Sequence, residues 1–223
     1  ALTRILGLKA HLGLNKKAKE ALVPAPEVLA GALGKEEYKE MHKAISRDCI
    51  TLVKYKDRDV LPITPERYKR IMIVHVKGAE SGMGMLMKAM GMGGGKNPAE
   101  MLKERLCEKG FDAFIYESPL DAMKKQIAAG EKPNINLYFA GKNAIDDFVS
   151  GMDLVITLCD VSSGRPSFGL SKGGGEIPWY VFELPVVVIG CGQPTMLADV
   201  PQARTYINTY DAKPATFDAL VDD

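Results

Sequence analysis

From residue 70 onward, the hydrophobic residues occur in short uninterrupted runs instead of alternating with polar residues. Such runs are typical of strands buried on both faces of a parallel sheet. The segments between the runs have helical spacing, which indicates strands alternating with helices. The runs predict strands at residues 71–76, 113–116, 154–158, 186–189 and 205–208. We therefore expect an α/β fold with a largely parallel sheet that helices cover on both faces.

The best-marked helix of this region begins with capping residues. Asn97 can accept a hydrogen bond from the first turn, Pro98 suits the first helical position, and Glu100 stands three residues after the cap. These residues predict a helix over 97–110. Further helices are expected at 121–129, at 143–150 and from residue 216, where the end of the chain at residue 223 is expected to cut the helix short.

The first seventy residues follow a different pattern. The opening segment ALTRILGLKAHLGL has an apolar helical face, but charged residues interrupt the apolar block that a signal peptide requires. Residues 13–34, with several Lys, Pro and Gly, predict a connector. Helical spacing predicts a helix at 35–48, and ITLVKYKDRDVLPI predicts a strand with an exit loop. We expect a helix and connector over 1–34 and a sandwich domain over 35–223.

The composition excludes several classes of protein. Of the 223 residues, 46% are hydrophobic and 26% are charged, which disfavours disordered, collagen-like and coiled-coil chains. No apolar run approaches the roughly 20 residues of a membrane span. Residues 1–70 contain 15 Lys and Arg against 9 acidic residues, but the basic residues are spread among the acids. This pattern favours neither nucleic acid nor a membrane surface as a partner.

A glycine-rich segment, SGMGMLMKAMGMGGGKNPAE, lies where open α/β sheets hold phosphates, between a strand and a helix. The dinucleotide motif G-x-G-x-x-G would need glycine at Met87, and a P-loop would need glycine at Met90 and Ser or Thr at Asn97. Five methionines within residues 83–92 indicate instead a loop that buries adaptable apolar side chains. A flavin or nucleotide binder that uses residues 81–100 remains an alternative.

The cysteines and histidines do not form a recognisable metal site. Cys49, Cys107, Cys159 and Cys191 contain no C-x-x-C pair and predict reduced, mostly packed thiols. The histidines share no metal-ligand spacing with one another or with the cysteines, so we expect no metal. His75 lies inside a predicted strand and is expected to be a core histidine with its hydrogen bonds satisfied.

The loop after Leu158 is the candidate site, because it follows a central strand of the predicted sheet at the strand's carboxyl end. Asp160, Arg165, Lys172 and Glu176 supply polar groups there, and aromatic residues supply a rigid apolar face beside them. The aromatic residues are Trp179, Tyr180 and Phe182. A sugar-contacting loop, a domain interface and the domain's own core all fit this mixture.

Three segments resemble the second domain of glycoside hydrolase family 3, near its β-N-acetylhexosaminidase branch. RILGLKAHLGL resembles the helix that leaves the family's catalytic barrel. KAISRDCITLVKYKDRDVLPI resembles the helix, T-L-V-K strand and Leu-Pro turn that open the family's α/β sandwich. GGEIPWYVFELPVVVIGCGQPTMLADVPQARTYINTYDAKPAT is similar to the family's closing run, with a Pro-x-x-L-x-D-x-P loop and a Tyr-Ile-Asn-x-Tyr strand. The resemblance implies a three-layer α/β/α sandwich with a flavodoxin-like, mostly parallel sheet after a helical linker.

The resemblance also implies that the chain is a fragment. In this family the carboxylate nucleophile lies in an N-terminal (β/α)8 barrel. In the hexosaminidase branch a His-Asp acid/base pair comes from a barrel loop with a K-H-F-P-G-H-G-like motif, which this chain lacks. We therefore expect an accessory domain of a cytoplasmic glycosidase, with no catalytic residue, no cofactor and no hydrolysis in isolation. Its expected partners are the barrel of the same polypeptide and a carbohydrate substrate.

The position of the loop and the resemblance together suggest residue roles. Arg165, Lys172, Asp160 and Glu176 are the expected sugar contacts, and the three aromatic residues are the expected interdomain interface. In the β-glucosidase branch of the family the second domain supplies an acid/base Glu, and a domain of that type is one alternative. The alternative from a different class is a non-catalytic interaction module whose Met-rich and Trp-rich loops only dock against a neighbouring domain.

Overall fold

The computed structural model describes residues 2–18, 23–56, 59–77, 90, 96–117, 125–132, 150–161, 184–198 and 200–222. The chain divides into two compact units, Ala1–Ala44 and Ile45–Asp223. This division falls inside helix α3 (Glu36–Cys49). The bounds of α3 confirm the helix expected at 35–48. The domain boundary expected after residue 34 stays a prediction, because compactness within one chain does not test where an independently folding domain begins.

The first unit consists of short helices. These are α1 (Leu2–His11), the 3-10 helix η1 (Leu14–Lys16), α2 (Pro26–Ala32) and most of α3. Among the described residues, α1, η1 and α2 contain no buried side chain. Leu2, for example, is 70% exposed. The apolar helical face expected near the start of the chain is therefore present, and its apolar side chains contact solvent.

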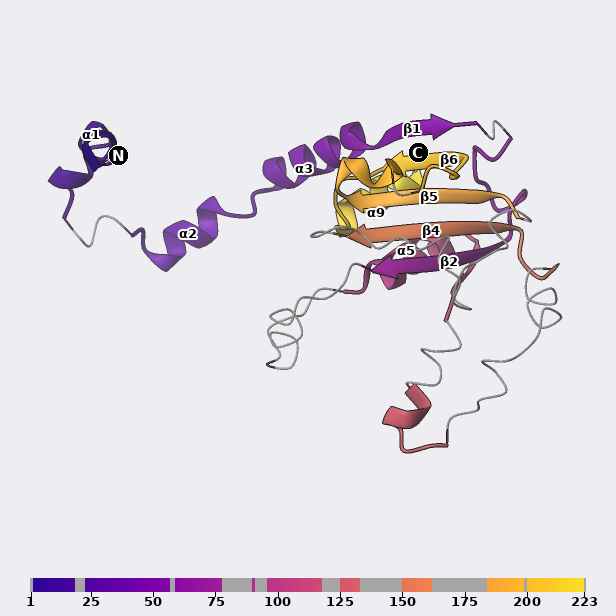
Figure 1. Cartoon of the computed structure of the whole chain (residues 1–223). Coiled ribbons are helices and arrows are strands. Elements are labelled where there is room, and N and C mark those ends of the chain that lie inside the picture. Colours follow the sequence, from indigo (N-terminus) through magenta and orange to yellow (C-terminus); the bar gives the residue numbers. More distant parts are fainter. Residues whose placement is uncertain are drawn as a thin grey trace. The chain divides into compact units, whose positions relative to one another are not determined.

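The second unit is built on a six-stranded sheet with the order β1-β6-β5-β4-β2-β3 (Figure 1). The edge strand β1 is antiparallel to β6, and all other neighbours are parallel. The order of the five parallel strands matches that of flavodoxin-like sheets. The strands are β1 (Thr51–Tyr55), β2 (Arg70–Lys77), β3 (Asp112–Ile115), β4 (Leu154–Val161), β5 (Val186–Gly192) and β6 (Thr205–Asn208). The α/β sandwich and each of its predicted strands are confirmed.

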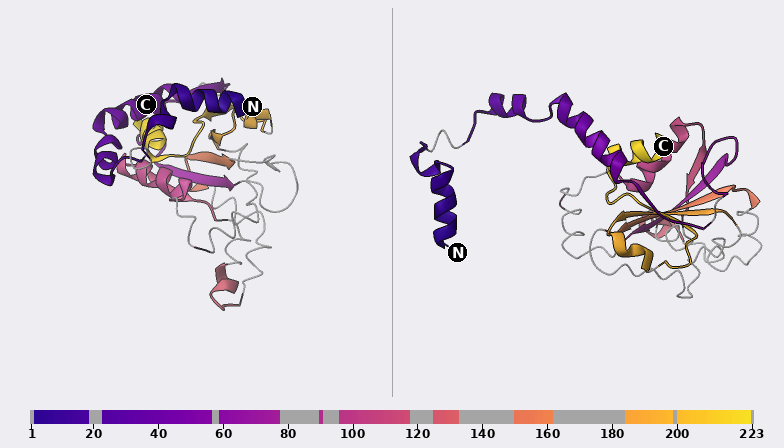
Figure 2. Two further views of the ribbon diagram at one scale, coloured as in Figure 1. Left: turned by 90° about the vertical axis from the view of Figure 1, so that its left-hand side faces the viewer. Right: turned by 90° about the horizontal axis from the view of Figure 1, so that it is seen from above.

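Two helices cover one face of the sheet. Helix α5 (Pro98–Glu108) and helix α9 (Pro214–Asp222) pack on a core that includes Leu154 and Phe217. A second core, around Met72, lies on the opposite face, where the 3-10 helix η4 (Pro194–Ala198) packs (Figure 2). Successive residues of a strand alternate between the two cores, so the continuous apolar runs in the sequence correspond to strands buried on both faces.

Helix α5 begins as its sequence predicts. The side chain of Asn97 accepts a hydrogen bond of 3.1 Å from the backbone N–H of Ala99, and Pro98 occupies the first turn. Ala99 and Leu102 are 0% and 1% exposed and anchor the helix on the sheet. The expected helix at 97–110 is therefore confirmed at its start and ends at Glu108.

Gly190 in β5 has a close neighbour on β6. A Cβ atom at this position would lie 2.2 Å from the Tyr206 hydroxyl oxygen and 2.9 Å from Oδ1 of Asn208. Tyr206 is completely buried. Only a residue without a side chain leaves room for this tyrosine, which explains a glycine in the middle of a buried apolar strand.

Several expectations fall wholly or partly outside the described residues. The glycine-rich segment is described only at Met90 and from residue 96 onward. Of the helices expected at 121–129 and 143–150, the structure describes residues 125–128 and residue 150 as helical. No helix of the described part is both long enough and apolar enough to cross a bilayer.

Candidate functional site

The connections between strands mark one position on the sheet. After β2 the chain forms β3 on one side of it, and the following strand, β4, lies on the other side. In open α/β sheets, this reversal separates the loops at the carboxyl ends of two adjacent strands and leaves a crevice where ligands bind. Strands β2 and β4 form this switch point, and the site must be sought at their carboxyl ends.

Both strands change from apolar to ionisable residues at this point. His75 lies near the end of β2, and Asp160 is near the end of β4. The Nε2 atom of His75 lies 3.9 Å from Oδ2 of Asp160. The His75 side chain is only 6% exposed, whereas that of Asp160 is 30% exposed. In this pair, the His75 side chain is therefore buried, whereas the Asp160 side chain reaches solvent.

The histidine does not meet the expectation for an ordinary core residue. Its Nε2 atom is buried and has no hydrogen-bond partner within the described part of the chain. A separation of 3.9 Å is about 1 Å longer than a typical N–H···O hydrogen bond. His75 was expected to be a core histidine with its hydrogen bonds satisfied, and the expectation that its hydrogen bonds are satisfied is wrong. Its side chain is buried, but the carboxylate of Asp160, in the described part of the chain, is just out of hydrogen-bond reach of Nε2.

Cys191, at the end of β5, extends the polar edge. Burial raises the pKa of its thiol to about 12, although a hydrogen bond from Thr209 lowers it, and the charges of Asp160 and Asp211 add to the rise. The Thr209 hydroxyl lies 3.3 Å from the Cys191 sulfur. Burial also raises the pKa of the thiol of Cys159. Neither thiol ionises near neutral pH, so neither can act as a thiolate nucleophile.

Asp211 follows β6 and organises the start of α9. Its carboxylate accepts hydrogen bonds from the Thr216 hydroxyl and from the backbone N–H of Lys213, and it forms an ion pair of 3.3 Å with the Lys213 ammonium. Burial raises the pKa of Asp211, but these hydrogen bonds and the lysine outweigh that effect and leave the pKa below its usual value. The hydrogen bond from the residue two positions later forms an Asx turn that leads into α9.

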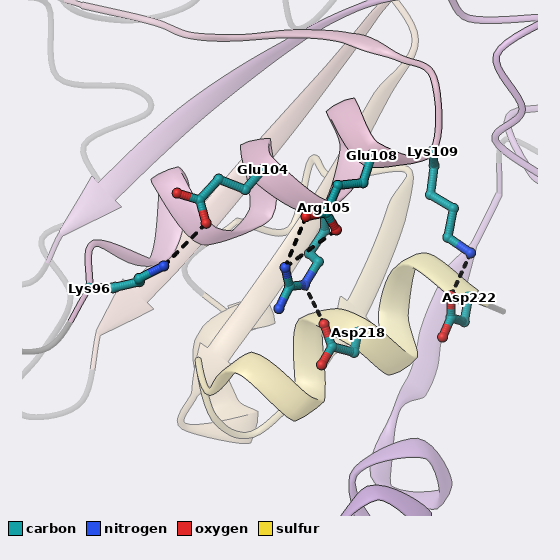
Figure 3. Close-up of polar contacts among 7 residues, drawn as sticks. All are labelled: Lys96, Glu104, Arg105, Glu108, Lys109, Asp218 and Asp222. Atoms are coloured by element: carbon teal, nitrogen blue, oxygen red, sulfur yellow. Dashed lines mark hydrogen bonds and ion pairs between the residues drawn. The ribbon is translucent and has the colours of Figure 1, made fainter.

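A second group of charges lies between α5 and α9 (Figure 3). Arg105 pairs with Asp218 and, at 3.3 Å, with Glu108, and Lys109 lies 2.6 Å from Asp222. These residues line a hollow of about 160 Å³. Each charge already has an oppositely charged partner, and exposed pairs of this kind contribute little to stability. The hollow therefore belongs to helix packing and is not the candidate site.

The residues predicted from sequence are only partly placed. Asp160 lies at the switch point, but as a residue of β4 and not of a loop after Leu158 as expected. The other predicted contacts, Arg165, Lys172, Glu176, Trp179, Tyr180 and Phe182, lie outside the described residues and stay predictions. Within the described part of the chain, no three His, Cys, Asp or Glu residues form a group that could hold a metal ion.

Sequence reasoning missed His75 as a member of the site. It treated a histidine inside an apolar run as core, because periodicity alone gives no strand order. The available signal was its position at the end of the first parallel strand, two residues before Lys77. The thiols were half correctly predicted: Cys159 and Cys191 are buried, whereas Cys49 and Cys107 are exposed.

The described residues form an open, flavodoxin-like sheet with an ionisable pair at its switch point, which is the position where α/β domains of this architecture bind ligands. No protein-family model matches the chain. A β-N-acetylglucosaminidase/β-glucosidase of Cellulomonas fimi is 29% identical over 225 residues, covering 99% of this chain and 35% of the relative. A solved β-glucoside phosphorylase, BglX, is 26% identical with a TM-score of 0.69, over 99% of this chain and 34% of that structure.

A glycoside hydrolase family 3 β-N-acetylglucosaminidase from Paenibacillus sp. str. FPU-7 shares the fold, with a TM-score of 0.52 and 16% identity over 99% of this chain and 35% of that structure. The chain is thus related to family 3 glycoside hydrolases and corresponds to an α/β-sandwich domain of these enzymes. It spans about a third of the length of the relatives that it matches. The resemblance to family 3 that was recognised in the sequence is confirmed, whereas the relatives are named for both N-acetylglucosaminides and β-glucosides and do not distinguish the branch.

Proposed function

We propose that this domain forms one wall of the substrate cleft of a family 3 glycosidase that acts on β-linked N-acetylglucosaminides or β-glucosides. The observation that carries the proposal is the coverage: a relative named for both activities matches 99% of this chain with only 35% of its own length. The remaining length of such an enzyme is where we place the barrel and its carboxylate nucleophile. The domain alone then lacks the reactive groups for glycoside cleavage.

The switch point is the part of the domain that we assign to the cleft. Asp160 reaches solvent there and can accept hydrogen bonds from sugar hydroxyl groups. The chain that follows β4 contains Arg165, Lys172 and Glu176, which we propose as further sugar contacts. Trp179, Tyr180 and Phe182 are our proposed contacts with the barrel, because aromatic side chains bury much area at domain interfaces.

The acceptor of the glycosyl group is a separate question. One relative is named as a glycosidase, for which the acceptor is water, and the solved relative with the TM-score of 0.69 is named as a phosphorylase, for which it is phosphate. Phosphorolysis is therefore the second candidate activity. We further propose a cytoplasmic location, which the four free cysteines favour because reduced thiols are typical of that compartment.

The test uses p-nitrophenyl β-N-acetylglucosaminide and p-nitrophenyl β-glucoside, each with and without inorganic phosphate. The full-length gene product that contains this chain, which is the longest polypeptide encoded with it, is compared with the 223-residue chain alone. We expect turnover by the longer polypeptide only, and a loss of at least about tenfold in kcat/KM after Arg165→Ala or Lys172→Ala. Saturable turnover by the isolated chain would reject the accessory role, and unchanged kinetics of both variants would reject the proposed sugar contacts.

A further inference from the structure

The pair at the switch point combines two properties that seldom occur together. The Nε2 atom of His75 is buried and lacks a hydrogen-bond partner in the described part of the chain, and a polar atom in that state costs free energy. At the same time it faces a carboxylate 3.9 Å away that is partly open to solvent. When this buried nitrogen carries a proton, the nearby carboxylate, whose side chain is 30% exposed, is a suitable acceptor for it.

The surroundings restrict what the histidine can do. On the same face of the sheet, Cys191 of β5 lies next to Asp160 of β4. Its thiol is neutral near neutral pH and competes only weakly with His75 as a hydrogen-bond partner of Asp160. Ile71 and Ile73 precede His75 on its own face of β2 and are both completely buried. The His75 side chain is 6% exposed and the Asp160 side chain is 30% exposed, so the carboxylate has more room than the imidazole to move and close the gap.

We infer that His75 is a positioning residue for Asp160. With its proton on Nε2, the imidazole donates to Oδ2 of Asp160 once a shift of about 1 Å brings the two atoms within hydrogen-bond distance. Oδ1 then remains available in a fixed orientation for a sugar hydroxyl. This role rests on the proposed function, because it assigns His75 an effect on substrate only through Asp160.

A double-mutant cycle in the longest encoded polypeptide tests the inference. His75→Leu removes the donor, His75→Gln keeps an N–H at similar reach, and Asp160→Asn removes the charged acceptor. We expect His75→Leu to lower kcat/KM by about tenfold or more, the scale of a hydrogen bond to a charged group, and His75→Gln to restore most of that loss. In the Asp160→Asn background the remaining amide oxygen is an uncharged and weaker acceptor, so His75→Leu should lower kcat/KM by a clearly smaller factor than in the wild-type background.

The control is Met72→Leu, a conservative change at a completely buried residue on the opposite face of β2. Its kcat/KM should equal that of the wild type. Equal losses from His75→Leu with and without Asp160→Asn would show that the histidine acts through the fold and would overturn the inference. Melting temperatures are measured for every variant, and His75→Met, which also lacks a hydrogen-bond donor, replaces His75→Leu in the cycle if His75→Leu does not fold.

A second measurement separates this inference from the proposed function. In the 223-residue chain, the ¹⁵N and ¹H shifts of the His75 imidazole report which nitrogen carries the proton. We expect a protonated Nε2 whose resonance moves in Asp160→Asn and stays in place in Met72→Leu. An unprotonated Nε2, or a resonance insensitive to Asp160→Asn, would overturn the positioning role. Absence of glycoside turnover alongside the expected shifts would reject the proposed function and leave the His75–Asp160 contact established.

Discussion

The interior of the parallel sheet and its carboxyl edge are built from the same strands, but they follow different physical rules. In the interior, Ile71 of β2 pairs in register with Leu154 of β4, and both are completely buried apolar residues. At the edge, the same strands place His75 beside Asp160, with burial and unmet hydrogen-bonding capacity at the same atom. The interior maximises apolar burial, whereas the edge retains groups whose burial costs free energy.

This difference indicates what each region contributes. Stability alone does not explain an unpartnered buried nitrogen, because an apolar residue of similar size would serve the fold as well or better. Local departures of this kind concentrate at functional sites. The comparison therefore predicts large effects of interior substitutions on the free energy of unfolding, and small effects of edge substitutions on stability.

Leu154→Ala should give the largest loss of stability. Its side chain is completely buried between the sheet and the two helices, so truncation leaves a cavity, and we expect the free energy of unfolding to fall by about 2–5 kcal/mol. Urea denaturation measures this change. The matched control is Leu52→Ala in β1, where the side chain is 46% exposed and the loss should stay below about 1 kcal/mol. Equal losses would contradict the described burial.

Gly190→Ala should give the next largest loss of stability. The added methyl group would meet the buried Tyr206 hydroxyl, and adjustment of β5 against β6 should cost about 1–3 kcal/mol in the free energy of unfolding. Gly7→Ala is the control, because a Cβ at Gly7 contacts nothing within 4 Å and alanine favours the helix. If Gly190→Ala were as stable as the wild type, the packing of Tyr206 over this glycine would be wrong.

The buried strands in the interior of the parallel sheet were the part of the fold that the sequence predicted best. The runs at 71–76, 154–158 and 186–189 are buried strands, and each strand extends past the predicted end toward the carboxyl edge. Apolar periodicity reports burial, and it fades where the residues become polar. The predicted strand ends therefore stopped short of Asp160 and Cys191, and Asp160, which was expected in the loop after Leu158, is a residue of β4.

The candidate site could be predicted only in part, because it depends on strand order. Nothing in the sequence states that β4 returns to the far side of β2, and only that crossover brings His75 beside Asp160. Likewise, an apolar helical face in residues 2–11 predicts the helix but not the burial of its side chains. Local patterns fix local structure, whereas the neighbours of a residue depend on chain connections that these patterns do not encode.

Asp211→Ala should give a moderate, pH-dependent loss. The folded state lowers the pKa of this carboxylate, so the unfolded state binds more protons in acid. The stabilisation is therefore complete above the usual aspartate pKa of about 3.9 and is lost as the pH falls through the folded pKa. We expect about 1 kcal/mol at pH 7 from the loss of these local hydrogen bonds, measured as the difference in urea stability from the wild type.

The difference between wild type and Asp211→Ala should shrink as the pH is lowered below about 4. Asp211→Asn supplies the control, since its amide oxygen can still accept the hydrogen bonds from Thr216 and Lys213 but carries no charge to titrate. Its stability relative to Asp211→Ala should not change with pH. If the difference in stability between the wild type and Asp211→Ala grew in acid, the sign would be reversed and the lowered pKa of Asp211 in the folded state would be excluded.

His75→Leu should have the smallest effect on stability. Leucine fills a similar volume and removes a buried nitrogen that has no hydrogen-bond partner in the described residues, so the free energy of unfolding should change by less than about 0.5 kcal/mol or rise. A loss above about 2 kcal/mol would show that this histidine holds the fold together, and the edge would then follow the same rule as the interior. A stable variant would instead show that the fold gains nothing from the buried His75 nitrogen. Function would then be the reason that this polar atom, whose burial costs free energy, lies beside Asp160.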